Sequence, residues 1–351
     1  MDFGLALAPG IEAWRWVKRA EELGFSHAWL YDTQLLCADF FVAAALAAAN
    51  TSRIRIGPGV LVPTNRIAPV AANGLASLNA IAPGRITFGV GTGFTARLTM
   101  GLGPMRLADL RDYVRVVRGM LAGETVEWTH EGVVRKVRFL DPGAGMVNIR
   151  DRIPLHLSAF APKARALAAE IADGWMNFVA LPAMAVHEVD AIMASCDGVG
   201  RKRDSLYKTG FTLGCVLHDG EDAGSARARA QAGPLAAVLF HGLIEGTIEP
   251  ALLPPELQAA LADYRRVYET YEPTDARYLQ LHRGHLMWVR PEEERFVTPE
   301  LIRMATFTGT RDELRDRVRA LAAAGYDQLA VQLVPGHEAA IEDWADVFAG
   351  V

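Results

Sequence analysis

Residues 153–175 read IPLHLSAFAPKARALAAEIADGW and hold one complete unit of the pattern that decides the fold. Apolar residues predict a strand over Pro154–Ser158, and Pro162 stands where the first turn of a helix is expected. The helix expected over Lys163–Ala172 carries its apolar residues on one side, and Gly174 ends it. This stretch therefore predicts a strand and a helix followed directly by another strand.

The same unit recurs along the chain, and the step from a helix-ending glycine to an aromatic residue occurs three times, at Gly24-Phe25, Gly174-Trp175 and Gly325-Tyr326. Eight strands that alternate with helices predict a parallel sheet closed into a (β/α)₈ (TIM) barrel of the α/β class, and an open doubly wound sheet is the alternative. The strands are expected at 3–8, 27–31, 54–62, 86–90, 154–158, 175–179, 211–217 and 328–334, helices at 11–23, 40–50, 69–81, 107–121 and 163–172, and a β-rich excursion at 125–140.

The composition excludes several classes of protein. The 351 residues are 51% hydrophobic, which excludes a disordered chain, and 36 basic against 41 acidic residues form no basic block of the kind that binds nucleic acid. The longest apolar run, Phe40–Ala49, is half a membrane span. Three scattered cysteines and a start without a signal peptide predict a cytoplasmic protein without a disulfide framework or zinc cluster.

One segment, 242–299, interrupts the alternation of strands and helices between the seventh and eighth strands. It is rich in tyrosine and histidine, which predicts a helical insertion within a single domain, 1–351, rather than a second domain. Insertions of this length usually form a lid or an oligomer contact, so a homodimer is one expected assembly.

Functional residues of such a barrel lie where its strands end. After the second strand, Asp32 either caps the next helix or contacts a ligand. After the fourth, Gly91-Thr-Gly-Phe-Thr-Ala96 matches a dinucleotide fingerprint only weakly, because Gly101, Gly103 and Pro104 interrupt an immediate helix. Its glycines instead leave room for a flat ring to approach the backbone.

The segment Ser158–Lys163 follows the fifth strand and opens a helix. The free N–H groups of a first helical turn, with Lys163 beside them, form an anion site, although Ser158 could simply cap the helix. We expect no metal site: His282 and His285 lack a nearby cysteine or a third spaced ligand, and no hydrolase motif is present.

Residues 54–93, IRIGPGVLVPTNRIAPVAANGLASLNAIAPGRITFGVGTG, resemble the luciferase-like superfamily of flavin- and deazaflavin-dependent oxidoreductases. The stretches GFSHAWLYD (24–32), 153–175 and TFTGTRDELRDRVRALAAAGYDQLAVQ (306–332) resemble the same family. The resemblance implies a (β/α)₈ barrel that binds F420 or FMN at its mouth, with a non-proline cis peptide at Gly59-Val60 under the ring. The cofactor contacts that it implies are Asp32, Gly59, Val60, Gly91, Thr92, Ser158, Ala159 and Phe160, and Lys163 joins them as part of the anion site.

The resemblance favours F420, with FMN as the alternative. Thr33 and Phe94 stand where the F420-dependent sugar-phosphate dehydrogenases carry His and Glu, and Phe160-Ala161 replaces a Gly-Gly pair of many relatives. With F420 we expect hydride transfer with a small, uncharged, fairly apolar substrate. With FMN we expect a monooxygenase that takes reduced flavin from a separate reductase, and a non-catalytic cofactor carrier is a remote third possibility.

Few titratable groups are expected near the mouth. Histidine suits proton transfer near neutral pH because its unperturbed pKa is about 6.5. We expect His285, in the insertion, to be the proton donor or substrate contact, with His156 as the second candidate; each is alternatively a core histidine.

Overall fold

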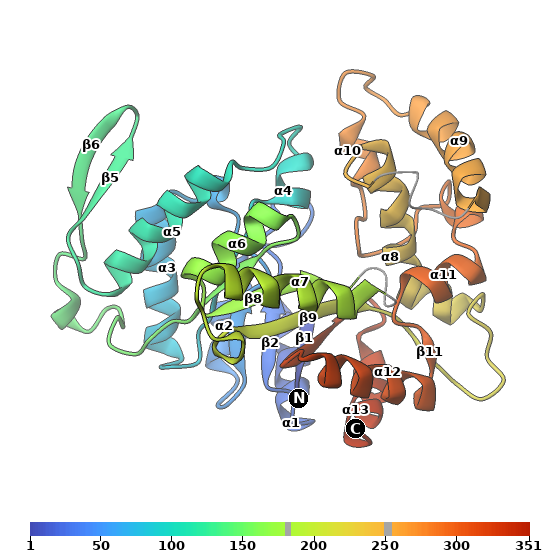
Figure 1. The fold of residues 1–351 in the computed structure, drawn as a ribbon, viewed down its shortest axis with the longest axis horizontal. Coiled ribbons are helices and arrows are strands. Elements are labelled where there is room, and N and C mark those ends of the chain that lie inside the picture. Colours follow the sequence, from blue (N-terminus) through green and yellow to red (C-terminus); the bar gives the residue numbers. More distant parts are fainter. Residues whose placement is uncertain (180–183, 249–254) are drawn as a thin grey trace.

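The computed structural model describes residues 1–179, 184–248 and 255–351. Its centre is an eight-stranded parallel barrel (Figure 1), which confirms the predicted fold class. Around the barrel the strands follow the order β3-β2-β1-β12-β9-β8-β7-β4. Their bounds are β1 (Asp2–Leu7), β2 (His27–Leu30), β3 (Arg55–Pro58), β4 (Phe88–Val90), β7 (Leu155–Ser158), β8 (Gly174–Phe178), β9 (Tyr207–Leu213) and β12 (Gln328–Leu333).

The barrel closes between β3 and β4, the two strands at the ends of this spatial order. Only two isolated parallel bridges join this seam, Ile56 with Ile86 and Leu61 with Val90. The backbone N–H of Leu61 also donates to the carbonyl of Gly89 at 2.9 Å. Gly89 is required here, because a Cβ at this position would overlap the carbonyl oxygen of Pro58. The backbones of β3 and β4 are therefore closely packed at this seam.

Helices cover the outside of the barrel and bury its main core. Gly325 ends α12 in the left-handed conformation, as the glycine–aromatic pattern predicts, and Tyr326 is buried beyond it. The prediction is wrong at Gly174, because α6 ends earlier, at Ile171, and Gly174 is the first residue of β8. The outer helices are α1 (Ala13–Glu22), α2 (Phe40–Ala49), α3 (Ala68–Ile81), α4 (Phe94–Leu98), α5 (Leu107–Leu121), α6 (Pro162–Ile171), α7 (Ala185–Gly198), α12 (Arg311–Ala324) and α13 (Ile341–Ala349). Short 3₁₀ turns occupy 63–65, 142–144, 203–205, 294–296 and 338–340.

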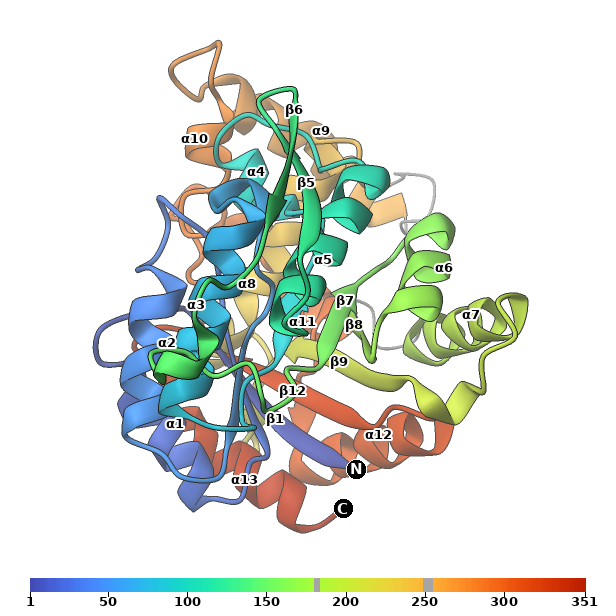
Figure 2. The ribbon, with the colours of Figure 1, turned by 90° about the vertical axis from the view of Figure 1, so that its left-hand side faces the viewer.

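Between β9 and β12 the chain forms the expected helical insertion, which rises beside the barrel in Figure 1. Its helices are α8 (Ala226–Ile244), α9 (Pro255–Glu269), α10 (Tyr278–Leu281) and α11 (Pro299–Ala305). They share a second hydrophobic cluster, separate from the main core. In Figure 2, α9 and α10 lie at the same end of the molecule as α4. The insertion thus stands at the end of the barrel where β4 leads into α4.

The third and seventh predicted strands are wrong in their bounds. The third, expected over 54–62, ends at Pro58. The seventh strand of the barrel is Tyr207–Leu213, whereas 216–217 form β10 (Val216–Leu217), which pairs with β11 (Gly309–Thr310) in a separate small sheet. Gly214 separates the two strands. His218 therefore does not end a barrel strand. The β-rich excursion is confirmed as the hairpin β5 (Val126–His130) and β6 (Val133–Val137), which projects from the barrel in Figure 1.

Among the described residues, no helix is both long and apolar enough to span a membrane.

Candidate cofactor site and histidine cluster

The backbone immediately after β3 has the conformation that the sequence resemblance implies. The Gly59-Val60 peptide bond is cis, which confirms that prediction. Gly59 and Val60 are both half-buried, at the end of the barrel strands. A flat surface of backbone is thus presented at the barrel mouth.

Predicted cofactor residues from three neighbouring strands meet at this point. A Cβ built on Gly91 would lie 3.0 Å from Val60 Cγ2 and 3.3 Å from the Cβ of Ser158. The structure therefore brings Val60, Gly91 and Ser158 so close together that a side chain at Gly91 would crowd both neighbours. Thr92, half-buried, follows directly. This arrangement fits a flat ring resting on the ends of β3 and β4.

Asp32 binds the segment that follows the cis peptide and does not cap a helix. Its carboxylate accepts from the guanidinium of Arg66 at 2.7 Å, from the backbone N–H of Val62 at 3.1 Å and from Asn65 at 3.2 Å. Helix α2 is capped by Asp39 instead, so the capping alternative for Asp32 is wrong. Asp32 is buried, with 4% of its surface exposed, and these hydrogen bonds hold the segment after the cis peptide in place.

The segment after β7 has the features of the predicted anion site. Helix α6 begins at Pro162, and its N-cap residue Ala161 provides no side-chain hydrogen bond, so capping by Ser158 is wrong. The first-turn N–H groups are consequently left for a ligand. Lys163 is exposed beside them. Phe160, which is 50% exposed, lines a cavity of about 170 Å³ with Asn177, Phe178, Val179, Met184, Ala185 and Glu188.

His156, the second catalytic candidate, lies deep in the barrel. Its ring rests on Gly174, where a Cβ would come within 2.6 Å of it, and its centroid is 5.6 Å from those of Trp29 and Tyr207. Gly174 and Tyr207 begin their strands, so His156 is at the end of the barrel opposite the mouth. Burial, with smaller contributions from His27 and Arg55, lowers its pKa to about 3. The structure does not bring His156 together with the cofactor residues.

This buried neutral histidine predicts a pH dependence of stability. Unfolded His156 would titrate near pH 6.5, so the unfolded chain takes up this proton before the folded chain does. The stability due to this group is complete above pH 6.5 and is lost as the pH falls toward 3, by up to about 1.4 kcal/mol per pH unit. We expect His156→Leu to reduce the slope of unfolding free energy against pH, measured by urea unfolding between pH 7 and 4.5. The exposed His187→Asn is the control, and an unchanged slope in His156→Leu would contradict the prediction.

His285, the first catalytic candidate, lies at the mouth in a cluster of three buried histidines. Its Nε2 is 3.1 Å from the hydroxyl of Thr95, in the helix that follows β4. Its Nδ1 is 3.3 Å from Nδ1 of His241 and 3.4 Å from Nδ1 of His282. The neighbouring backbone is tied to the barrel as well, because Gln332, at the end of β12, donates to the carbonyl of Leu286 at 2.5 Å.

His241 was missed by the sequence analysis. It lies 44 residues before His285, in α8, and no local spacing connects the two. Only the packing of α8 against the loop after α10 brings them together. The nearest usable signal was the apolar run 232–244, in which His241 is the single titratable residue.

Carboxylates surround the histidine cluster. Nε2 of His241 is 2.7 Å from Glu293, which also binds Arg290 and accepts from the hydroxyl of Tyr264 at 2.6 Å. Burial would raise the pKa of Glu293, but hydrogen bonds from His241 and Arg290 hold it well below its usual range. Nε2 of His282 is 2.6 Å from Glu245. Burial, followed by the neighbouring His241 and His282, keeps the pKa of His285 well below its usual value.

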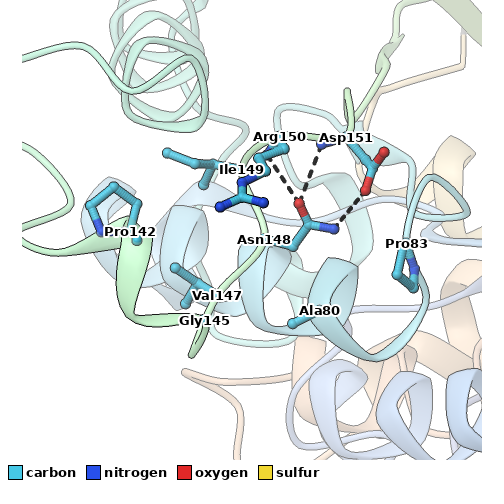
Figure 3. Close-up of a pocket in the computed structure, with 10 residues that line it drawn as sticks. Ala80, Pro83, Pro142, Gly145, Val147, Asn148, Ile149, Arg150 and Asp151 are labelled. Carbon is cyan, nitrogen blue, oxygen red and sulfur yellow. Dashed lines mark hydrogen bonds between the residues drawn. The ribbon is translucent and has the colours of Figure 1, made fainter.

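A larger cavity of about 510 Å³ lies at the opposite end of the barrel (Figure 3). It is between the end of α3 and the segment before β7, where Asn148 accepts from the backbone of Arg150 and donates to Asp151 at 2.7 Å. Those hydrogen bonds stabilise the loop itself. Because this cavity is at the N-terminal ends of β4 and β7, it is not a candidate for the cofactor site.

Comparisons with known proteins agree with this geometry. A family model described as luciferase-like monooxygenase matches residues 8–328. A 5,10-methylenetetrahydromethanopterin reductase of Methanolobus tindarius is 30% identical over 236 residues, 66% of this chain and 69% of that protein. An F420-dependent glucose-6-phosphate dehydrogenase of Microbacterium testaceum is 30% identical over 269 residues, 71% of this chain and 76% of that protein. The structure of a coenzyme F420-dependent tetrahydromethanopterin reductase from Methanopyrus kandleri shares the fold, with a TM-score of 0.68 over 98% of this chain and 97% of that chain at 22% identity.

Proposed function

The chain belongs to the luciferase-like monooxygenase family, and from this premise we propose that it is an F420-dependent oxidoreductase. The observation that carries the proposal is the meeting of the cis Gly59-Val60 peptide, Gly91 and Ser158 at the ends of three neighbouring strands, where the residues implied to contact the cofactor pack closely together. F420, when bound, supplies a carbon that accepts or gives up a hydride. The two relatives described above, named for F420 or for methylenetetrahydromethanopterin, support this choice.

The chain's own residues would hold such a cofactor in two parts. Gly59, Val60, Gly91 and Thr92 support one face of the ring, and Asp32 keeps the segment after the cis peptide in place through Arg66. Farther along the mouth, Ser158, Ala159 and Phe160 lead to the start of α6. There the first-turn N–H groups and Lys163 would bind the phosphate of the cofactor side chain.

The substrate that we propose is small, uncharged and fairly apolar. Phe94 and Phe160 are 38% and 50% exposed at the ends of β4 and β7, so an apolar surface faces the ring position. A sugar phosphate is disfavoured because Thr33 and Phe94 replace the His and Glu of the sugar-phosphate branch. Apolar walls also exclude water from the reacting face.

We propose that His285 acts at this face through Thr95. Its Nε2 is within hydrogen-bonding distance of the Thr95 hydroxyl, three residues after Thr92. His285 is 4% exposed and its other ring nitrogen faces two histidines, so it is a positioning residue that orients this hydroxyl toward the substrate. The role of proton donor for His285, and any role for His156, stay predictions from the sequence.

Direct binding measurements test the cofactor. Titration of the purified chain with F420 and, separately, with FMN should show F420 bound at least about tenfold more tightly, because the anion site matches its charged side chain. Oxidation of small alcohols with F420, and reduction of ketones and enones with reduced F420, then tests turnover. Tighter binding of FMN would instead support the FMN-dependent monooxygenase. Binding of F420 without turnover of any substrate would support a cofactor carrier.

Charge reversal at the anion site tests the placement of the cofactor phosphate. We expect Lys163→Glu to weaken F420 binding about tenfold at low salt, and less at high salt, because this exposed charge is screened. Fluorescence titration of F420 at two ionic strengths measures the effect. Lys18→Glu, on the exposed side of α1, is the matched control. Equal affinities for wild type and Lys163→Glu at low salt would place the phosphate elsewhere.

We also propose a homodimer in the cytoplasm, supplied with reduced cofactor by a separate reductase. The long insertion supports an oligomer contact, and the three unpaired cysteines suit a reducing compartment. Light scattering of the purified chain would test the dimer.

A further inference from the structure

We propose that His241, His282 and His285 bind one divalent transition-metal ion of the Zn²⁺ class, between α8 and the loop that follows α10. The ligand atoms of the three side chains all lie within 4.8 Å of one another, and all three residues are buried. The proposal departs from the expectation of no metal, which rested on the lack of a third ligand close in sequence. It does not depend on the identity of the cofactor.

The separation of the ring nitrogens matches a tetrahedral metal centre. Nδ1 of His285 is 3.3 Å from Nδ1 of His241 and 3.4 Å from Nδ1 of His282. Two imidazole nitrogens bound to one tetrahedral Zn²⁺ ion, each at about 2.0–2.1 Å, stand about 3.4 Å apart. Two of the three nitrogen separations are therefore already those of ligands, and in our proposal rotation of the rings brings the third, which is within 4.8 Å, to the same spacing.

In His241 and His282, the ring nitrogen that faces away from the cluster is hydrogen-bonded to a carboxylate, as is usual for histidines that bind a metal. Nε2 of His241 faces Glu293 at 2.7 Å, and Nε2 of His282 faces Glu245 at 2.6 Å. An ionised carboxylate only accepts hydrogen bonds, so the ring proton of each histidine is on Nε2 and the Nδ1 lone pair points inward. Carboxylates placed in this way behind the ligands fix the tautomer and increase the basicity of the metal-binding nitrogen.

Hydrogen bonds alone do not satisfy this cluster. His241 and His282 both direct lone pairs toward Nδ1 of His285. A proton on Nδ1 of His285 can donate a good hydrogen bond to only one of these two lone pairs. The other lone pair is then buried without a partner, which costs free energy. A cation between the three rings satisfies all three lone pairs at once.

The charges around the cluster also favour a cation. Arg290 compensates Glu293, but the second carboxylate oxygen of Glu245 is buried without a partner among the described residues. A set of imidazoles with no carboxylate in direct contact selects Zn²⁺, Co²⁺, Ni²⁺ or Cu²⁺ over Mg²⁺ or Ca²⁺. Three protein ligands leave a fourth position for water or another oxygen ligand.

A metal at this point would join two parts of the insertion beside the barrel mouth. His241 belongs to α8, His282 and His285 to the segment that follows α10, and Nε2 of His285 meets Thr95 of α4. Binding through Nδ1 keeps the proton of His285 on Nε2, where it donates to the Thr95 hydroxyl. The metal would thereby fix the residue that positions this hydroxyl at the mouth.

Metal analysis of the full chain tests the proposal without any cofactor. The protein is stripped with a chelator and titrated with Zn²⁺ and with Co²⁺, followed by dialysis and elemental analysis. We expect about one ion per chain, a visible spectrum typical of tetrahedral Co²⁺ with nitrogen ligands, and a higher midpoint of thermal unfolding. Because neither F420 nor substrate is present, failure here is separate from failure of the proposed function.

Variants locate the ion. His241→Ala and His282→Ala should lose the bound ion and the Co²⁺ spectrum, whereas His241→Cys should retain metal because thiolate also binds Zn²⁺. Glu245→Gln should weaken Zn²⁺ binding about 10- to 100-fold. The exposed His218→Ala is the control and should keep the stoichiometry of the wild type. Wild-type protein that binds no more Zn²⁺ or Co²⁺ than the folded His282→Ala variant overturns the proposal.

Discussion

Replacing Gly89 by alanine should destabilise the barrel by about 3 kcal/mol or more and abolish F420 binding. The new Cβ would overlap the carbonyl oxygen of Pro58, a backbone atom that cannot rotate away as a side chain would. Strands β3 and β4 would have to separate at a seam that only two isolated bridges join. The same movement would displace the Gly59-Val60 peptide from beneath the ring position.

Urea unfolding and F420 titration measure the two effects of Gly89→Ala. Gly103→Ala is the matched control, since a Cβ there meets no atom within 4 Å. The control should keep wild-type stability to within about 0.5 kcal/mol. If Gly89→Ala unfolds at the same urea concentration as Gly103→Ala, the strand contact at this seam does not restrict the barrel mouth.

Replacing His285 by alanine should reduce turnover by about 100-fold or more while leaving F420 affinity unchanged. In the role that we propose, the imidazole would orient the Thr95 hydroxyl at the reacting face and would not itself hold the ring. The loss should therefore appear in kcat rather than in the F420 dissociation constant. The measurement is F420 reduction with an uncharged alcohol, or reduced-F420 oxidation with an enone, that the wild type converts.

Two variants of Thr95 separate this role from a structural one. Thr95→Val removes the hydroxyl while keeping the histidine cluster and should lower kcat as His285→Ala does. Thr95→Ser retains the hydroxyl and should restore most of the activity. Native turnover in a folded His285→Ala variant would contradict the role of His285 and leave proton transfer to solvent.

Local patterns were sufficient to predict most of the fold. Apolar strands, amphipathic helices and glycine stops act over a few residues, and the helix expected over 107–121 forms at those bounds. The cis peptide at Gly59-Val60 followed from a resemblance in a contiguous stretch. The seventh strand was misplaced because the apolar run lies at 211–217, whereas the strand begins in the more polar stretch from Tyr207. Only the pairing of Val216 with Gly309 shows that the end of the apolar run leaves the barrel.

The sequence by itself determined the barrel, its insertion and the strand ends that would hold a cofactor, because each depends on neighbours within one strand–helix unit. Only the tertiary structure decided which side chains meet across the insertion. His241 comes from α8 and His285 from the loop after α10, far along the chain. Their approach depends on how α8 packs against that loop. The tertiary structure likewise decided that Asp32 binds Arg66 and that His156 lies at the end of the barrel opposite the mouth. Such contacts depend on how distant segments pack together, and the periodicity of the sequence does not predict that packing.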